Sequence, residues 1–292
     1  MKRPQIIITP GDPAGIGPEI IAKALASPDL PTDCDYHLLP YDCATAPGKP
    51  DSASARVALD TLEEAARRLH HGEADAVVTG PVSKELLQAI GFPYPGQTEF
   101  FCDRLEASEV TMCLTGDHLT VALVTIHIPL ADVANSLSPS SIVRSGKHLA
   151  EYMRKRLRRT PRIAVCGLNP HAGENGAFGR EEIEIISPAI AQLRALGMAE
   201  FSGPHVPDAI FRDAARGDFD AVLCMYHDQG LIPLKLLDFD NAVNITLGLP
   251  RPRLSPDHGT AFALAGKNIA HHSSMLRALQ RAAEMVKSDQ SV

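Results

Sequence analysis

The 292-residue chain lacks the features that mark nucleic-acid-binding and membrane proteins. It has no basic excess, since 28 Lys and Arg stand against 35 Asp and Glu and give a formal net charge of −7. The one basic cluster, residues 154–159, fits the exposed face and end of a helix, so a nucleic-acid partner is not expected. The apolar run Ile6–Ile8 is too short for a signal peptide or a membrane span.

Paired cysteines are also missing. The six cysteines are scattered and form no Cys-x-x-Cys motif, so a reduced, cytoplasmic compartment fits better than a disulfide framework. Cys113, Cys166 and Cys224 lie inside apolar strand-like runs, where a free cysteine behaves as a small hydrophobic residue. The composition therefore predicts a soluble cytoplasmic protein.

What the sequence does contain is a regular alternation of strand-like and helix-like segments, without internal repeats or low-complexity tracts. Such an alternation predicts an α/β fold built on an open sheet. We expect strands at 5–9, 76–79, 110–114, 119–126, 162–168, 221–226 and 242–247, and helices at 17–26, 55–70, 83–90, 98–107, 138–158, 181–196, 260–265 and 275–287.

No linker marks a domain boundary. The Pro- and Gly-rich breaks at 92–96 and 249–253 are the best candidates for crossings between domains. If both are crossings, residues 1–96 and 254–292 form one α/β domain from the two chain ends, and residues 97–253 form a central α/β domain. The site would then lie in the cleft between them.

Three histidines stand apart from the other nine because each follows an apolar strand and opens a loop marked by glycine or proline. They are His127, His171 and His227. In a parallel α/β sheet, the loops after the strands converge on one crevice. Three neutral imidazoles without a fourth protein ligand suit a divalent metal that keeps positions open for substrate. Such a metal would lower the pKa of a substrate hydroxyl and stabilise a developing alkoxide or enolate.

Polar residues beside apolar runs form a second group of candidates. Arg253, next to two prolines, is well placed to grip a carboxylate or phosphate. Asn244 lies inside the apolar run 242–247 and needs a partner if it is buried. Thr98 lies at an expected helix N-terminus, which suits an anion, although an ordinary N-cap explains it about as well. A solvated charged face would explain Lys235.

Two glycine-containing turns join strands to helices. Residues 11–19 include Gly15 and Gly17 but no third glycine at the dinucleotide-binding spacing, so the turn is not a Rossmann fingerprint. On local grounds a tight strand-to-helix turn explains it. Residues 257–261, Asp-His-Gly-Thr-Ala, are explained locally by another capped turn.

In combination, these segments resemble the 4-hydroxythreonine-4-phosphate dehydrogenase family, NAD-dependent enzymes of vitamin B6 (pyridoxal phosphate) biosynthesis. The Gly-Ile-Gly-Pro-Glu and His-Gly-Thr-Ala motifs also resemble the wider isocitrate/isopropylmalate dehydrogenase fold, in which the second motif lies at the NAD adenosine. The matching stretches span nearly the whole chain: 8–19, 79–84, 96–101, 166–174, 225–230, 243–250 and 257–261.

The resemblance implies two α/β/α domains of the isocitrate/isopropylmalate dehydrogenase type, with the active site in the interdomain cleft. It implies a homodimer in which histidines from both subunits hold a Zn²⁺, Mg²⁺ or Co²⁺ ion. The family reaction oxidises the C3 hydroxyl of 4-phosphooxy-L-threonine with NAD, and the β-keto acid then loses CO2 to give 3-amino-2-oxopropyl phosphate. The resemblance implies three metal ligands, His127, His171 and His227, which are catalytic together with Lys235. The implied substrate contacts are Gln97, Thr98, Asp208, Lys235, Asn244 and Arg253. The implied cofactor contacts are Gly11, Asp257, His258, Gly259 and Thr260.

This sequence departs from the family pattern at Gln97, where the family usually has histidine before Thr-Glu, and the segment 39–52 is abbreviated. Glutamine can hydrogen-bond substrate but cannot carry a proton at neutral pH. A related dehydrogenase acting on phosphothreonate or phosphoerythronate is therefore the alternative. The three histidines argue against a phosphotransacylase-like transferase, and no output domain supports a non-catalytic regulator. No arginine lies in 257–261 to meet a 2′-phosphate, which favours NAD over NADP.

Overall fold

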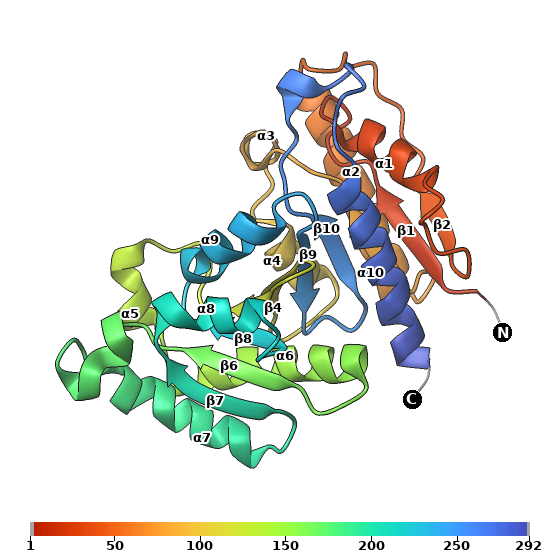
Figure 1. Cartoon of the computed structure of the whole chain (residues 1–292). Helices are drawn as coiled ribbons and strands as arrows, with labels where there is room; N and C mark the ends of the chain where they lie inside the picture. The colour runs from red at the N-terminus through yellow and green to blue at the C-terminus, as the bar shows by residue number, and fades with distance from the viewer. Residues whose placement is uncertain (1–2, 291–292) are drawn as a thin grey trace. The chain divides into compact units, whose positions relative to one another are not determined.

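The computed structural model describes residues 3–290, which form two compact α/β units (Figure 1). The first unit comprises residues 1–108 and 243–292, and the second comprises 109–242. The expected boundaries at 96/97 and 253/254 are therefore displaced. Helix α4 (Gln97–Arg104) belongs to the first unit because Phe100 and Phe101 pack in its core. Strand β9 (Val243–Leu247) belongs there because it pairs with β10 (Arg253–Pro256).

The sheet of the first unit has the strand order β2-β1-β3-β10-β9. Its strands are parallel except for β9, which runs antiparallel to β10. The apolar run at Ile6–Ile8 is almost completely buried, as expected for a strand covered on both faces. The three remaining strands are β1 (Gln5–Thr9), β2 (Asp35–Leu38) and β3 (Ala76–Thr79).

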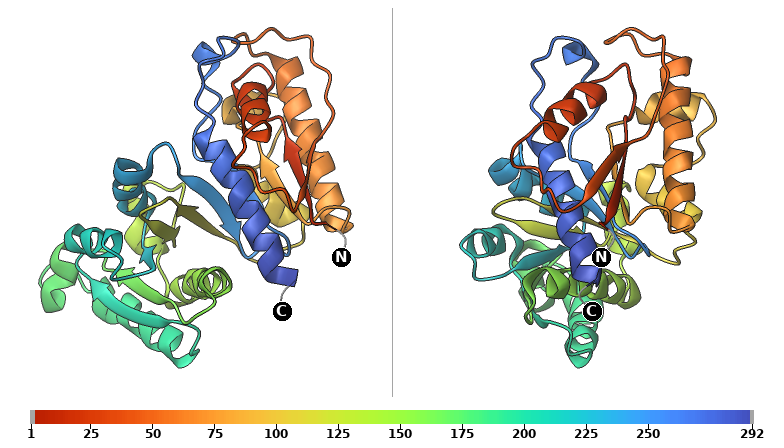
Figure 2. Two further views of the ribbon diagram at one scale, coloured as in Figure 1. Left: turned by 45° about the vertical axis from the view of Figure 1, so that its right-hand side comes forward. Right: turned by 90° about the vertical axis from the view of Figure 1, so that its right-hand side faces the viewer.

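Helices cover both faces of this sheet (Figure 2). One face carries α2 (Ser52–His70), α3 (Lys84–Ala89) and α4, and the other carries α1 (Gly17–Leu25) and α10 (Ser273–Gln290). Helix α2 begins with a capping box, in which the Asp51 carboxylate accepts a hydrogen bond from Ser54 N and the Ser54 hydroxyl oxygen accepts one from Asp51 N. Its buried residues recur every three or four positions, which is the pattern of a helix packed along one face.

The second unit is also a three-layer arrangement, with the strand order β4-β5-β8-β6-β7. Strands β5, β8, β6 and β7 are parallel neighbours in that order. Within this unit, only β4 is antiparallel, and it pairs with β5. The strands are β4 (Thr111–Thr115), β5 (Thr120–Leu123), β6 (Arg162–Cys166), β7 (Glu200–His205) and β8 (Ala221–Cys224). Helices α6 (Pro139–Leu157) and α7 (Ser187–Ala195) pack on one face, and α8 (Pro207–Ala215) and α9 (His227–Asp238) on the other. Short elements are η1 (Leu130–Asp132), α5 (Val133–Ser136) and η2 (Pro170–Gly176).

The predicted α/β fold is confirmed, but several elements differ from expectation. The expected helix at 181–196 starts as a π-helical turn, η3 (Glu182–Ile186), before it continues as α7. The expected helix at 260–265 is only a 3-10 turn, η4 (Phe262–Leu264). Strands β2, β7 and β10 and helices α8 and α9 were not expected; the three strands are short and carry no clear apolar periodicity. None of the helices within residues 3–290 is both long and apolar enough to cross a membrane.

Candidate active site

The three predicted metal ligands all follow neighbouring parallel strands of the second unit. His127 follows β5, His227 follows β8 and His171 follows β6, and these strands lie side by side in the order β5-β8-β6. The carboxyl ends of parallel strands lie at one edge of a sheet, where ligands of α/β proteins bind. The topology therefore directs all three histidines to the same edge.

His127 and His227 come together at this edge, with ring centroids 5.8 Å apart. His227 is the first residue of α9 and does not open a loop as expected. Its Nδ1 lies 2.6 Å from an Asp228 carboxylate oxygen. A carboxylate that accepts the Nδ1 proton leaves the Nε2 lone pair available, which is the usual arrangement behind a metal-bound histidine. The pair thus fits a divalent metal.

His171 does not join this pair within one chain. It is exposed in η2, where its ring centroid lies 6.1 Å from that of Phe178. Within residues 3–290, no group of three or more His, Cys, Asp or Glu side chains is arranged to hold a metal ion. The donor chemistry therefore suits a divalent ion, but a single chain gathers only two of the three predicted ligands.

The backbone around His171 is unusual. Five consecutive residues, 171–175, have φ between 43° and 80°, although only Gly173 among them lacks a side chain. The left-handed region costs an L-residue about 1–2 kcal/mol. Such strain persists only where surrounding contacts impose it, and it concentrates at functional sites.

In the first unit, the most informative predicted residue is Arg253, which is only 3% exposed. Its Nη2 donates to Thr79 Oγ1 and Gln97 Oε1, both at 2.8 Å, and Nη1 lies 3.4 Å from Thr246 Oγ1. These partners are all neutral, and Arg253 Nε has no partner. Burial lowers the pKa of this guanidinium to about 10. The Glu99 carboxylate attracts this cation without a hydrogen bond to it, so the buried charge is only partly compensated, and the planar guanidinium suits a carboxylate or phosphate.

Strand register places a further predicted contact beside Arg253. Arg253 on β10 lies opposite Thr246 on β9. Asn244 is two residues from Thr246, so the side chains of both lie on the same face of β9. The Asn244 Oδ1 atom is buried without a partner. This face therefore combines a buried cation with an unsatisfied amide oxygen, as expected where a polar ligand completes the hydrogen bonding.

Gln97 and Thr98 form the first turn of α4, whose N-cap is Gly96. Thr98 is therefore not the N-cap, and it is buried at 5% exposure. Because the Gln97 oxygen accepts from Arg253, the amide NH2 remains to donate to a ligand. The other two predicted substrate contacts lie in the second unit: Lys235 is half-buried in α9, two turns beyond His227, and Asp208 is exposed in the first turn of α8.

The two predicted cofactor turns contact each other within the first unit. Ile16 N donates to Thr260 O at 2.9 Å, and a Cβ on Gly15 would lie 2.8 Å from the same oxygen. Gly11 has φ +73°, and a Cβ there would lie 2.3 Å from Pro81 O. His258 Nδ1 lies 3.1 Å from Gly259 O, and His258 Nε2 is buried without a partner. An unpaired acceptor nitrogen beside a tight backbone turn fits a hydrogen-bonding ligand such as a nucleoside.

Several polar residues at these sites were not singled out from the sequence. Thr79 and Thr246 hold Arg253, and both lie in stretches that match the family, which was the only available signal. Buried Gln229 links two strand ends, since its Oε1 accepts from Met225 N and its Nε2 donates to Gly167 O. No periodic pattern reveals such residues, because their partners are distant in the sequence.

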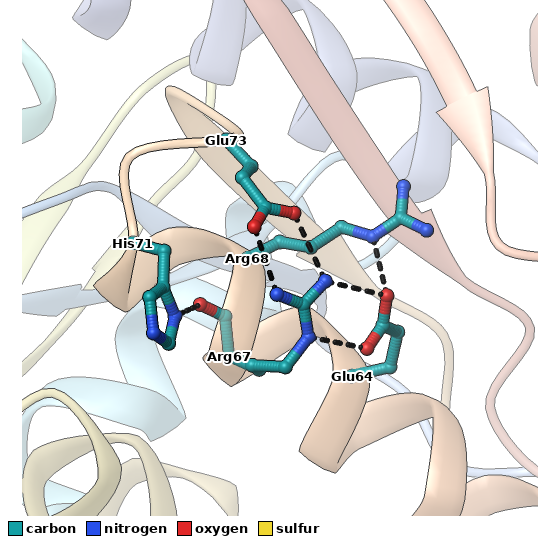
Figure 3. A network of polar contacts seen from close by, with 5 residues as sticks. All are labelled: Glu64, Arg67, Arg68, His71 and Glu73. Atoms are coloured by element: carbon teal, nitrogen blue, oxygen red, sulfur yellow. Dashed lines mark hydrogen bonds and ion pairs between the residues drawn. The ribbon is translucent and has the colours of Figure 1, made fainter.

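A hollow elsewhere in the first unit contains none of the predicted site residues. Its two arginines are already paired: Arg104 bonds Glu63, and Arg67 bonds both Glu64 and Glu73 in a network that includes Arg68 (Figure 3). We interpret this surface as a solvated ion-pair network. The residues that line the hollow are Glu63, Arg67, His70, His71, Arg104 and Glu106.

Comparison with known proteins identifies the class. A family model described as "Pyridoxal phosphate biosynthetic protein PdxA" matches residues 19–282. A protein from Erythrobacter litoralis called 4-hydroxythreonine-4-phosphate dehydrogenase is 44% identical, and the alignment covers 97% of this chain and 98% of that protein. A protein of the same name from Zymomonas mobilis is 42% identical, and the alignment covers 98% of this chain and 97% of that protein. A crystal structure with that name from Klebsiella pneumoniae has a TM-score of 0.86 at 34% identity, covering 97% of this chain and 98% of that one.

The chain is therefore an α/β oxidoreductase. It belongs to the PdxA family of pyridoxal phosphate biosynthetic proteins. The expected relation to the isocitrate dehydrogenase fold is also confirmed, since isocitrate dehydrogenase from Methylococcus capsulatus superposes with a TM-score of 0.54 at 15% identity. That likeness concerns the fold alone.

Proposed function

We propose that the chain oxidises the C3 hydroxyl of 4-phosphooxy-L-threonine with NAD, and that the β-keto acid formed then loses CO2 to give 3-amino-2-oxopropyl phosphate. Family membership and the names of the relatives support this substrate. The structural observation that carries the proposal is the buried Arg253, whose hydrogen-bond partners are neutral. A substrate with both a phosphate and a carboxylate supplies an anion that can hydrogen-bond directly to this cation.

Each proposed site residue has a defined task. Arg253, Asn244, Thr98 and Gln97 bind and orient the anionic groups of the substrate, with Asp208 a further polar contact. Lys235 contacts the substrate and holds a proton at Nζ. The adenosine end of NAD lies against the turn 257–261 and Gly11, where the unpaired His258 Nε2 accepts a hydrogen bond.

We further propose that His127, His171 and His227 hold one divalent ion, Zn²⁺, Co²⁺ or Mg²⁺. The proximity of His127 to His227 and the Asp228 carboxylate behind His227 support this assignment. When bound, the ion supplies Lewis acidity that favours ionisation of the substrate hydroxyl. The side chain of Asp228 keeps the His227 ring oriented and its proton on Nδ1.

The proposed working unit is a homodimer. Helix α9, which starts at His227, and its C-cap residue Phe239 expose an apolar side: Ile232, Leu236 and Phe239 are 67%, 83% and 69% exposed. Their spacing places them along one side of the helix, and a contiguous exposed apolar patch indicates an interaction site. A second copy of the chain is the expected occupant, because His127 and His171 are exposed and one chain gathers only two of the three ligands. A cytoplasmic location is proposed with it, since none of the six cysteines, all within the described residues, forms a disulfide.

The alternative substrate is a four-carbon phosphorylated acid without the amino group, such as phosphothreonate or phosphoerythronate. The observation that favours it is the hydrogen bond from Arg253 to the Gln97 oxygen. This bond leaves Gln97 only NH2 donors for a ligand, and a donor suits a hydroxyl or carboxylate oxygen better than an ammonium group. Replacing Gln97 by His would then shift preference toward the amino acid.

The decisive experiment measures NADH formation with 4-phosphooxy-L-threonine and with phosphothreonate, before and after chelation. The amino acid should be the better substrate, chelation should abolish turnover, and added Zn²⁺, Co²⁺ or Mg²⁺ should restore it. A kcat/KM at least ~10-fold higher on phosphothreonate would establish the alternative substrate, since that ratio means ~1.4 kcal/mol in transition-state binding. Full activity of a metal-free protein in which all three histidines are alanine would refute the metal assignment.

A further inference from the structure

The strained segment that carries His171 is anchored by one buried carboxylate. Glu182 is 3% exposed, and its Oε1 accepts hydrogen bonds from Leu168 N at 2.7 Å and Asn169 N at 2.8 Å. Its Oε2 accepts from Asn169 Nδ2 at 2.9 Å. A buried carboxylate is costly unless hydrogen-bonded, and these three N–H donors compensate its charge. The donors belong to the two residues just before Pro170 and His171.

Local geometry is adapted to bring this carboxylate under the loop. Glu182 begins the π-helical turn η3, and such turns are rare and occur frequently at functional sites. A Cβ on Gly173 would lie 2.6 Å from Glu182 Oε2, and a Cβ on Gly167 would lie 3.1 Å from Oε1. Both glycines thus leave room for the carboxylate. The loop therefore closes around the Glu182 carboxylate.

The anchored segment is the one whose conformation needs support. Residues 171–175 are all left-handed, and at about 1–2 kcal/mol for each non-glycine residue the run would relax if its anchor were lost. Asn169 strengthens the anchor by bonding a second carboxylate, Glu181, at 2.7 Å. The side chain of His171 is exposed and has one ring contact, with Phe178, so its direction depends mainly on this backbone.

We propose that Glu182 is a positioning residue for His171: it fixes the left-handed loop so that the imidazole is directed for metal binding before the metal arrives. This inference rests on the proposed metal-binding function. A more disordered His171 would have to be ordered on binding, which costs affinity. Residues that orient metal ligands typically contribute 10–100-fold to metal affinity, so removal of the anchor should weaken binding by at least about tenfold.

The test uses Glu182→Gln, which keeps the shape of the side chain but replaces one acceptor oxygen by a donor that faces the Asn169 donor. Glu184→Gln is the matched control, because Glu184 is in the same turn but exposed, and pairs only with Arg180 among its described contacts. Co²⁺ alone is the probe, followed by its visible absorption spectrum and by titration against a competing chelator. Thermal unfolding of the metal-free proteins is measured in parallel. We expect Co²⁺ affinity to fall about tenfold or more and the spectrum to change in Glu182→Gln, and neither to change in Glu184→Gln.

The outcomes separate this inference from the proposed function. If the wild-type protein fails to bind Co²⁺, both are overturned. Suppose that the wild type binds Co²⁺ and that His171→Ala weakens this binding. If Glu182→Gln then retains wild-type affinity and spectrum, only the inference about Glu182 fails. A lower unfolding temperature of Glu182→Gln, without a change in Co²⁺ binding, would mark Glu182 as merely structural. Should Glu182→Gln not fold, Asn169→Ala removes only the side-chain link to the carboxylates. It should weaken Co²⁺ binding in the same direction, and unchanged binding would overturn the inference.

Discussion

Replacement of Arg253 by methionine should separate a binding arginine from a structural one. Burial lowers the pKa of Arg253 from its ordinary value to about 10, which corresponds to a cost of ~3 kcal/mol for the charged form. The group is protonated at neutral pH in both the folded and the unfolded protein, so the folded protein bears this whole cost until pH rises toward 10. Methionine is unbranched and apolar and fills irregular space well, so Arg253→Met removes the cost without leaving a large cavity.

Loss of the hydrogen bonds opposes this gain. Thr79, Gln97 and Thr246 each lose a donor, at about 1 kcal/mol per bond. The two effects nearly cancel, so the free energy of unfolding should change by less than ~2 kcal/mol. A structural arginine in a buried ion pair would instead cost about 3–5 kcal/mol on removal. Urea unfolding at neutral pH measures the difference.

Substrate binding should respond more strongly than stability. Removing one member of a buried charged contact costs about 2 kcal/mol or more, so kcat/KM should fall at least ~30-fold. Inorganic phosphate should raise the unfolding temperature of the wild type but not of the variant. Arg251→Met is the matched control, because Arg251 is partly exposed, pairs with Asp75 at 3.4 Å, and should leave both readouts near wild type. A loss of 4 kcal/mol in stability, or an unchanged kcat/KM, would show that Arg253 is structural and refute the reasoning.

Two further predictions concern the second unit. A hydrogen bond with the Asp238 carboxylate at 2.7 Å raises the pKa of His118. The stability that this pair adds is therefore complete below pH 6.5 and is lost as pH rises through the raised pKa. Urea unfolding of His118→Gln across this range should lack that decline, and an identical decline in both proteins would contradict the prediction. Leu236→Glu on the exposed side of α9 should convert dimers to monomers in light scattering and lower Co²⁺ occupancy, whereas Leu196→Glu, at a position 48% exposed at the end of α7, should do neither.

The sequence predicted that each of the three histidines follows a strand, but not how the three are arranged in space. Each follows an apolar run, and such runs are readily recognised as strands. The adjacency of β5, β8 and β6 depends on pairing between segments far apart in the sequence, which no local pattern specifies. Helix α9 was missed after His227 because it contains Gly230 and Pro233, and both residues disfavour a helix interior.

The residues whose structure is hardest to predict from sequence patterns lie in or next to the proposed functional sites. A buried arginine with neutral partners, five left-handed residues in succession and a proline inside α9 all contradict the ordinary preferences of their residue types. Each costs stability, and a fold retains such features when other contacts impose them. Glu182 imposes the left-handed loop through partners 13 and 14 residues earlier in the chain, and Thr79, Gln97 and Thr246 enclose Arg253 from three separate segments. The proposed catalytic arrangement is therefore held by buried polar contacts between distant segments, whereas the fold is set by apolar runs that the sequence displays locally.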